Sequence, residues 1–263
     1  MNDGALVSDD LRRYNEYLQS QLLSSGWKEW FTDWNLESWF DADGIAKLAE
    51  AQGVRGTLLK EYVQERAGFQ PKTKFDRPDI PLIFQPLLDR IHAAAERTGW
   101  SVKSPITVAT STDVSPSPFA LPSDSQHTLF IGIGTAKFCN CWAKAFTDVA
   151  LAVWKDDQDT KVPRIRDVLK IVQDRPQLLS FQFYLAMCYA KEGSVASAEQ
   201  EMPATRLEAI LKAYLIDAME LFVVGHEYAH FIAHERRPEF TGSLDPAKSI
   251  ELEKFCDSVG VIL

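Results

Sequence analysis

A long helical pattern near the C-terminal end is the feature that most constrains how this chain can fold. Thr205 and Glu208 have the spacing of a capping box, which marks the start of a helix. Apolar residues then recur at helical intervals: Leu207, Ile210, Leu211, Tyr214, Leu215, Ala218, Leu221 and Phe222. Pro238 stops the pattern. The sequence therefore predicts one long helix that begins near Arg206 and places His226 and His230 in a largely buried setting.

The last part of this predicted helix reads VVGHEYAHFIAHE over residues 223–235 and holds a candidate metal site. His226 and His230 are four residues apart, so a helix places them on one face, where their ring nitrogens can point at a single ion. Glu227 would flank that ion without binding it. A carboxylate in that position can take a proton from water that the metal activates, which makes Glu227 the candidate general base. The alternative is a buried polar patch that binds no metal.

His234 continues the four-residue spacing but does not fit the same site. On a straight helix it lies about 12 Å along the axis from His226, too far for both to bind one zinc ion. The longer HExxHxxGxxH pattern also fails, because Ala233 and Arg236 stand where it requires glycine and histidine. We expect His234 to be a helix-terminus residue near the carbonyl end of the dipole.

A third ligand is predicted on a second helix, within SIELEKFCDSVG at residues 249–260. Asp245 and Pro246 read as an N-cap and a first-turn proline, so this helix should run from Pro246 to about residue 259. Glu253 and Asp257 are four apart and share a face, whereas Glu251 points elsewhere. We expect Glu253 to be the third metal ligand and Asp257 to accept a hydrogen bond from a ligating histidine. The alternative is a solvated helix face.

The composition excludes several classes of function. The chain has 263 residues, 46% of them apolar and 25% charged, with a formal net charge of −9. These values predict a folded protein with a substantial core and no general affinity for nucleic acid. The first twenty residues do not resemble a secretory leader and no run of 18 apolar residues occurs, so we expect a cytoplasmic protein without a membrane span. Four cysteines without a CxxC pair favour reduced thiols over a disulfide scaffold.

The remaining pattern predicts an α+β fold, mainly helical with a small mixed or antiparallel sheet. Residues 104–111 and 127–134 are short apolar runs typical of strands, and residues 118–121 lie between them. Helices are expected at residues 9–23, 44–51, 57–66, 82–97, 137–154, 162–172 and 177–191. We expect a helical N-terminal region over residues 1–100 and a second region over 101–263.

Three tryptophans in the N-terminal region, Trp27, Trp30 and Trp34, would share one helix face. Burial in a core is the commoner fate of such a face, and a surface that binds a protein partner is the alternative.

HEYAH followed by Glu253 and Asp257 resembles the gluzincin zinc metallopeptidases, in which HExxH and ExxxD stand on successive helices. The pattern is also similar to compact bacterial forms, the ImmA/IrrE-like proteases and the membrane prenyl-protein proteases. The resemblance covers about residues 104–263. It implies a zincin-like catalytic core, zinc bound by His226, His230 and Glu253, Glu227 as base and Asp257 as the residue that orients a ligand. Members of these families normally continue with further helices or a lobe. We therefore expect that residues 101–263 form a domain truncated at its C-terminus, or that the chain is a fragment of a longer protein.

These observations lead to two hypotheses for function. In the first, the protein hydrolyses peptide bonds with zinc-activated water, and its partners are protein or peptide substrates. In the second, it is a regulatory protein with a zincin fold that acts through protein–protein contacts, with the N-terminal helical region as the operative part.

Overall fold

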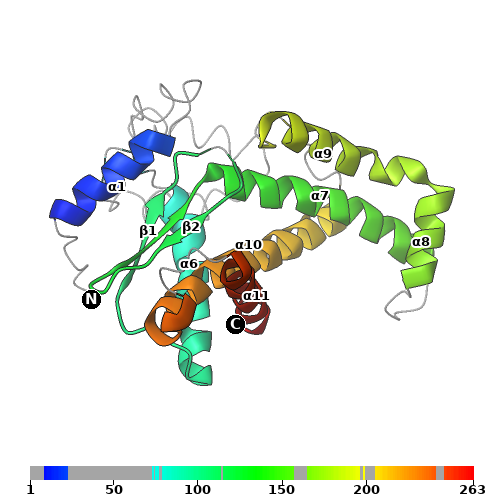
Figure 1. Ribbon diagram of the computed structural model, residues 1–263. Helices are drawn as coiled ribbons and strands as arrows, with labels where there is room; N and C mark the ends of the chain where they lie inside the picture. The colour runs from blue at the N-terminus through cyan, green and yellow to red at the C-terminus, as the bar shows by residue number, and fades with distance from the viewer. Residues whose placement is uncertain are drawn as a thin grey trace.

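The computed structural model describes residues 9–22, 73, 75–76, 79–113, 115–156, 165–195, 198, 205–240 and 246–263. The helices expected at residues 44–51 and 57–66, and the tryptophan face, lie outside these ranges. The described part is mainly helical with one small mixed sheet, as the sequence predicts (Figure 1).

The helices are α1 (Asp9–Leu22), α6 (Asp79–Thr98), α7 (Ile133–Asp156), α8 (Ile165–Asp174), α9 (Ser180–Glu192), α10 (Arg206–Arg236) and α11 (Pro246–Ile262). There are also two short 3-10 helices among the described residues. One, η2 (Pro176–Leu179), precedes α9, and the other, η3 (Pro238–Phe240), follows α10. The strands are β1 (Ile106–Thr110), β2 (Phe119–Leu121) and β3 (His127–Ile131).

The sheet has the order β1-β3-β2, with β3 in the middle. β1 runs parallel to β3, and β2 runs antiparallel to it with Ala120 opposite Leu129. All five residues of β3 are buried, the polar His127 and Thr128 included, as expected for the central strand of the sheet. β2 is an edge strand, so one side of its backbone is turned away from the sheet.

The boundary between β3 and α7 differs from the prediction, which extended the strand to residue 134 and began the helix near 137. The strand ends at Ile131, and the helix begins at Ile133. A Cβ atom at Gly132 would lie 2.5 Å from the carbonyl oxygen of Ser111, so only glycine fits at this turn. The N–H of Thr135 already donates to the carbonyl of Gly132 at 3.1 Å. The apolar pattern could not reveal this change of direction, because it continues across it.

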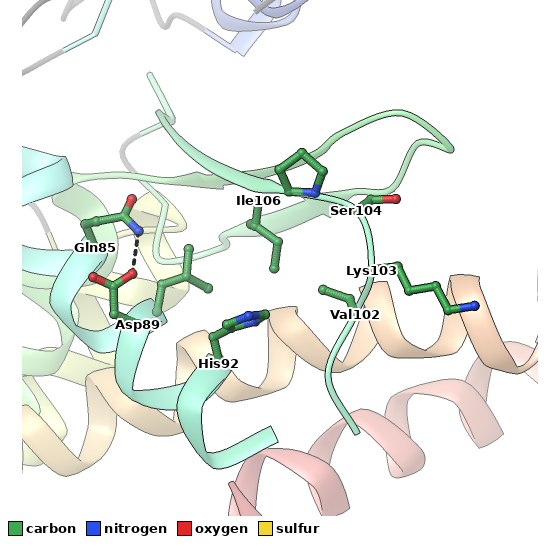
Figure 2. Close-up of a pocket in the computed structure, with 9 residues that line it drawn as sticks. Gln85, Asp89, His92, Val102, Lys103, Ser104 and Ile106 are labelled. Carbon is green, nitrogen blue, oxygen red and sulfur yellow. Dashed lines mark hydrogen bonds between the residues drawn. The ribbon is translucent and has the colours of Figure 1, made fainter. Parts of the chain in front are cut away.

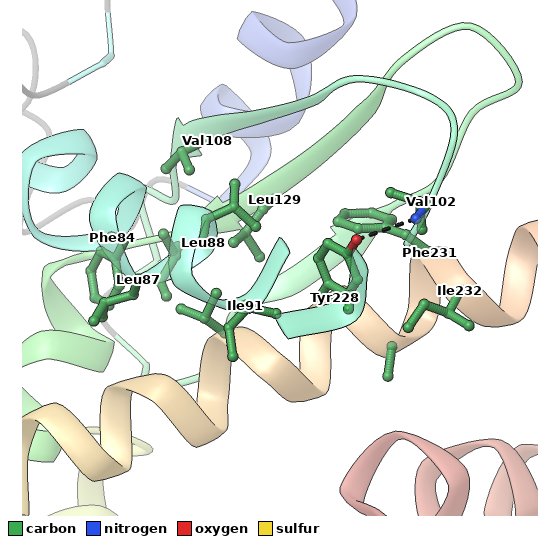
Figure 3. Close-up of a cluster of buried hydrophobic side chains, with 14 of the residues drawn as sticks. Phe84, Leu87, Leu88, Ile91, Val102, Val108, Leu129, Tyr228, Phe231 and Ile232 are labelled. Carbon is green, nitrogen blue, oxygen red and sulfur yellow. Dashed lines mark hydrogen bonds between the residues drawn. The ribbon is translucent and has the colours of Figure 1, made fainter. Parts of the chain in front are cut away.

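The main hydrophobic core lies between α6, the sheet and α10 (Figure 3). Its fully buried members include Phe84, Ile91, Leu129 and Tyr228. α6 therefore shares one core with elements from beyond residue 100, although the division into two regions at that position stays a prediction.

Helix α10 begins with the predicted cap. The hydroxyl of Thr205 accepts a hydrogen bond from the N–H of Glu208 at 3.1 Å. The Glu208 carboxylate lies 2.5 Å from Nζ of Lys144 on α7, so the same residue also joins the two helices. Figure 1 shows α10 running beside α7 with α11 against it. Among the described helices, α10 included, none has the length and apolar character needed to cross a membrane.

The far end of α10 is tied to the sheet by Glu235. Its carboxylate accepts hydrogen bonds from the N–H groups of Lys103 and Ser104 and contacts Nε2 of His127 at 3.1 Å. Nδ1 of His127 accepts from the N–H of Ser123 at 3.2 Å, so Nε2 carries the proton and donates to Glu235. These contacts hold the histidine-bearing half of α10 in a defined position against the strands.

Glu220 carries a buried carboxylate on α10 and provides a test of the packing. Its side chain is 7% exposed, and burial, followed by the charge of Asp217, raises the pKa of Glu220 from 4.5 to about 7. Between pH 4.5 and 7 the folded state binds more protons than the unfolded state, so this group lowers stability as the pH rises. We expect Glu220→Gln to increase the free energy of unfolding by up to about 3 kcal/mol at pH 8 and to have little effect below pH 4.

Urea unfolding of both proteins over this pH range measures the effect. Glu251→Gln, at an exposed position of α11, is the matched control and should not raise the free energy of unfolding at pH 8. Equal stability of wild type and Glu220→Gln at pH 8 would contradict the expected cost of ionising Glu220.

Candidate metal centre

The candidate metal centre lies where α10 and α11 come into contact. A Cβ atom on Gly260 would lie 3.0 Å from the backbone nitrogen of His226 and 3.2 Å from the carbonyl oxygen of Phe222. A Cβ atom on Gly225 would lie 3.1 Å from Cα of Gly260. The two helices thus touch backbone to backbone at a pair of glycines, closer than larger side chains would allow.

This contact brings the three predicted ligands together. Nε2 of His226 lies 3.2 Å from Oε2 of Glu253, and Nε2 of His230 lies 3.9 Å from Oε1 of the same carboxylate. One potential ligand atom from each of the three residues lies within 4.8 Å of the other two. Within the described ranges, no other group of three or more His, Cys, Asp or Glu side chains converges in this way.

The donor set fits zinc. Two imidazoles and one carboxylate are ligands that zinc accepts, and three protein ligands leave a fourth tetrahedral position for water or substrate. Ligand atoms that bind one zinc ion at its usual distances lie ~3.4 Å apart. The observed separations of 3.2 and 3.9 Å, measured to the two oxygens of Glu253, lie on either side of that value. The side chains of His226 and His230 are about one-fifth exposed, which leaves the centre accessible from solvent.

Asp257 contacts the ring nitrogen of His226 that does not face Glu253. Its Oδ1 is 3.0 Å from Nδ1 of His226. Since a carboxylate only accepts, Nδ1 donates the hydrogen bond, and Nε2 is left free to bind the metal. Burial lowers the pKa of His230, an effect that Glu253 opposes and His226 reinforces. The second histidine is therefore kept in the neutral form that a ligand requires.

Glu227 is buried beside the three ligands, with its side chain 7% exposed. Burial, followed by the charge of Glu253, raises the pKa of Glu227 to about 8. Its carboxylate accepts a hydrogen bond from the backbone N–H of Ala120, on the edge strand β2. A carboxyl group with a raised pKa can both take up and release a proton near neutral pH. The same contact positions β2 directly beside the candidate base.

His234 lies away from the centre. Its Nε2 is 3.4 Å from Oδ1 of Asp124, and its ring meets that of His127 edge to face with centroids 5.9 Å apart. Its position in the last turn of α10 agrees with the expected helix-terminus role.

Tyr228 belongs to the HEYAH motif, but its side chain lies on the opposite face of α10. Its hydroxyl accepts a hydrogen bond from the N–H of Val102 at 3.2 Å and forms a second hydrogen bond with Nδ1 of His92 at 2.9 Å. His92 lines a cavity of about 270 Å3 between α6 and the start of β1 (Figure 2). In that cavity Gln85 and Asp89 already bond to each other at 2.9 Å. Tyr228 therefore connects α10 to the core and contributes nothing to the metal centre.

Sequence reasoning missed three residues that help to form the metal centre. Gly225 and Gly260 could have been noticed as glycines within helical patterns, where each costs up to about 1 kcal/mol and so suggests a close packing contact. Ala120 acts through its backbone N–H, and its side chain carries no signal.

Cys256 is fully buried close to the centre. Burial, followed by the charges of Glu253, Glu227 and Asp257, raises the pKa of its thiol. The thiol therefore stays protonated, a form that binds zinc poorly.

Comparison of the chain with protein-family models, curated proteins and solved structures gives no match. The assignment of a function therefore depends on the residues of the metal centre.

Proposed function

We propose that this protein is a zinc-dependent metallopeptidase of the gluzincin type, with a zincin-like catalytic core and a cytoplasmic location. The observation that carries the proposal is the convergence of His226, His230 and Glu253 from two helices on one point. The buried Glu227 beside that point and the bond from His226 to Asp257 add the two further parts that such a site needs.

In the proposed reaction a bound zinc ion would polarise the scissile carbonyl and lower the pKa of the attacking water. Glu227 takes the proton from that water and passes it to the departing amine. Asp257 keeps His226 in the tautomer that presents Nε2. The edge strand β2, joined to Glu227 through Ala120, is the strand to which an extended peptide would add as a further strand.

The test is metal content followed by peptide cleavage. The purified protein should contain one zinc ion per chain and should cleave members of an internally quenched peptide library. Zinc without any cleavage would favour the regulatory alternative, and a protein that cannot bind zinc would exclude both hypotheses.

The choice of Glu253 as ligand makes a separate prediction. We expect Glu253→Ala to lower zinc affinity at least about 100-fold, because it removes one of three protein ligands. Glu251→Ala, two positions away on the exposed side of α11, is the matched control and should change the affinity less than about twofold. Competition with a chromogenic zinc chelator measures both. Equal effects would show that the wrong carboxylate was assigned.

A further inference from the structure

A second cavity, of about 450 Å3, lies between the segment before β2 and helices α7 and α9. It is lined by Pro116, Ser117, Phe138, Trp142, Ala186 and Tyr189. None of these side chains carries a charge, and three of them are aromatic. A pocket of this size and lining is typical of sites that hold an apolar group.

The aromatic walls are supported from behind. The ring of Phe138 lies 6.0 Å from that of Trp142 and meets the ring of Tyr189 edge to face at 6.3 Å, measured between centroids. Phe138 and Trp142 also pack on a small hydrophobic cluster formed by Cys141, Ala145, Leu185, Val195 and Ala198. The cavity is therefore a built feature of the α7–α9 pair and not a gap between loose side chains.

The cavity borders the segment that leads into the edge strand beside the metal centre. Pro116 and Ser117 lie just before β2, and Ala120 donates to Glu227. Ser117 and Ala120 are three positions apart, so their Cα atoms lie at most about 11 Å from each other. A peptide that follows β2 with its cleaved bond at Glu227 thus reaches the cavity within about three residues of that bond.

We infer that this cavity is the specificity pocket of the proposed peptidase and takes a large apolar or aromatic side chain of the substrate. The inference rests on the proposed function. A charged side chain is disfavoured, because the lining offers no opposite charge to offset its loss of water. An aromatic side chain gains both burial and ring–ring contact with Phe138, Trp142 and Tyr189.

The test uses an internally quenched peptide library in which each position near the cleaved bond is varied in turn. The zinc-loaded protein should show kcat/KM at least about 10-fold higher for Phe or Leu than for Ala at one position within three residues of that bond. Ala186→Phe, which fills the cavity, should abolish this preference. Met187→Phe, at a position of the same helix that is 69% exposed and does not line the cavity, is the control and should keep the wild-type preference.

Three results would overturn the inference while leaving the proposed function intact: equal rates for Phe and Ala peptides, a preference for Lys or Arg, or an unchanged preference in Ala186→Phe. If the wild type cleaves no peptide, the proposed function fails, and the cavity is tested by binding. In that case the Glu227→Gln protein is titrated with matched Phe- and Ala-containing hexapeptides. Tighter binding of the Phe peptide that Ala186→Phe removes would support the pocket, and equal binding would overturn it.

Discussion

Replacement of Glu227 by glutamine is expected to lower kcat for peptide cleavage about 1,000-fold or more, with zinc still bound at one ion per chain. Glutamine has nearly the same shape but cannot accept a proton from water, and general acid–base catalysis of this kind contributes about 10²–10⁴-fold. Its amide oxygen can still accept the hydrogen bond from Ala120, so the edge strand should stay in place. Because a neutral side chain is easier to bury at this 7% exposed position, stability should not fall.

Steady-state kinetics, metal analysis and thermal unfolding of the same preparation check the three parts of this expectation. Glu251→Gln, on the exposed side of α11, controls for the loss of one carboxylate near the centre and should retain full activity. A Glu227→Gln protein that keeps the wild-type kcat would remove Glu227 from the mechanism. Loss of zinc from that variant would mean that Glu227 holds the metal, contrary to the assignment of Glu253.

The second large effect is expected from Gly260→Val, which tests how the centre is assembled. A Cβ atom at this position already lies 3.0 Å from the backbone nitrogen of His226, and the two further methyl groups of valine have no room against α10. Backbone cannot yield as a flexible side chain can, so α11 must move away. We expect the free energy of unfolding to fall by ~3 kcal/mol. We also expect a loss of zinc affinity at least as large as that of Glu253→Ala, because Glu253 and Asp257 move with the helix.

Ser258→Val is the matched control, because Ser258 is exposed on the same helix and the substitution adds a β-branched residue without a clash. It should lower stability by less than about 1 kcal/mol and leave zinc affinity unchanged. Denaturant unfolding and chelator competition measure both quantities. Wild-type zinc affinity in a folded Gly260→Val protein would show that the glycine contact does not position the ligands.

Much of the fold could be read from the sequence where the signal is local. The Thr205 cap, the long apolar stripe of α10 and the proline that begins α11 follow from hydrogen bonding and periodicity within a few residues. The turn at Gly132 could not be predicted in this way. It depends on the carbonyl of Ser111, which belongs to a different part of the sheet.

The candidate centre also has parts that local sequence determines and parts that depend on tertiary packing. His226, Glu227 and His230 share a helix, so their spacing alone determines which of them face one point and which flanks it. The same geometry separates His234 from His226, and it puts Glu253 and Asp257 on one face of the next helix.

Only the tertiary structure decided whether the two helices meet. The backbone contact of Gly225 with Gly260 brings Glu253 within reach of both histidines. Burial, followed by the charge of Glu253, raises the pKa of Glu227. The α7–α9 cavity likewise exists because helices distant in sequence pack side by side. Helix geometry repeats every few residues, so a short stretch of sequence is enough to determine which side chains share a face. The distance between two helices depends on how small the residues are where the helices cross. Which residues meet at the crossing is determined only when the chain folds.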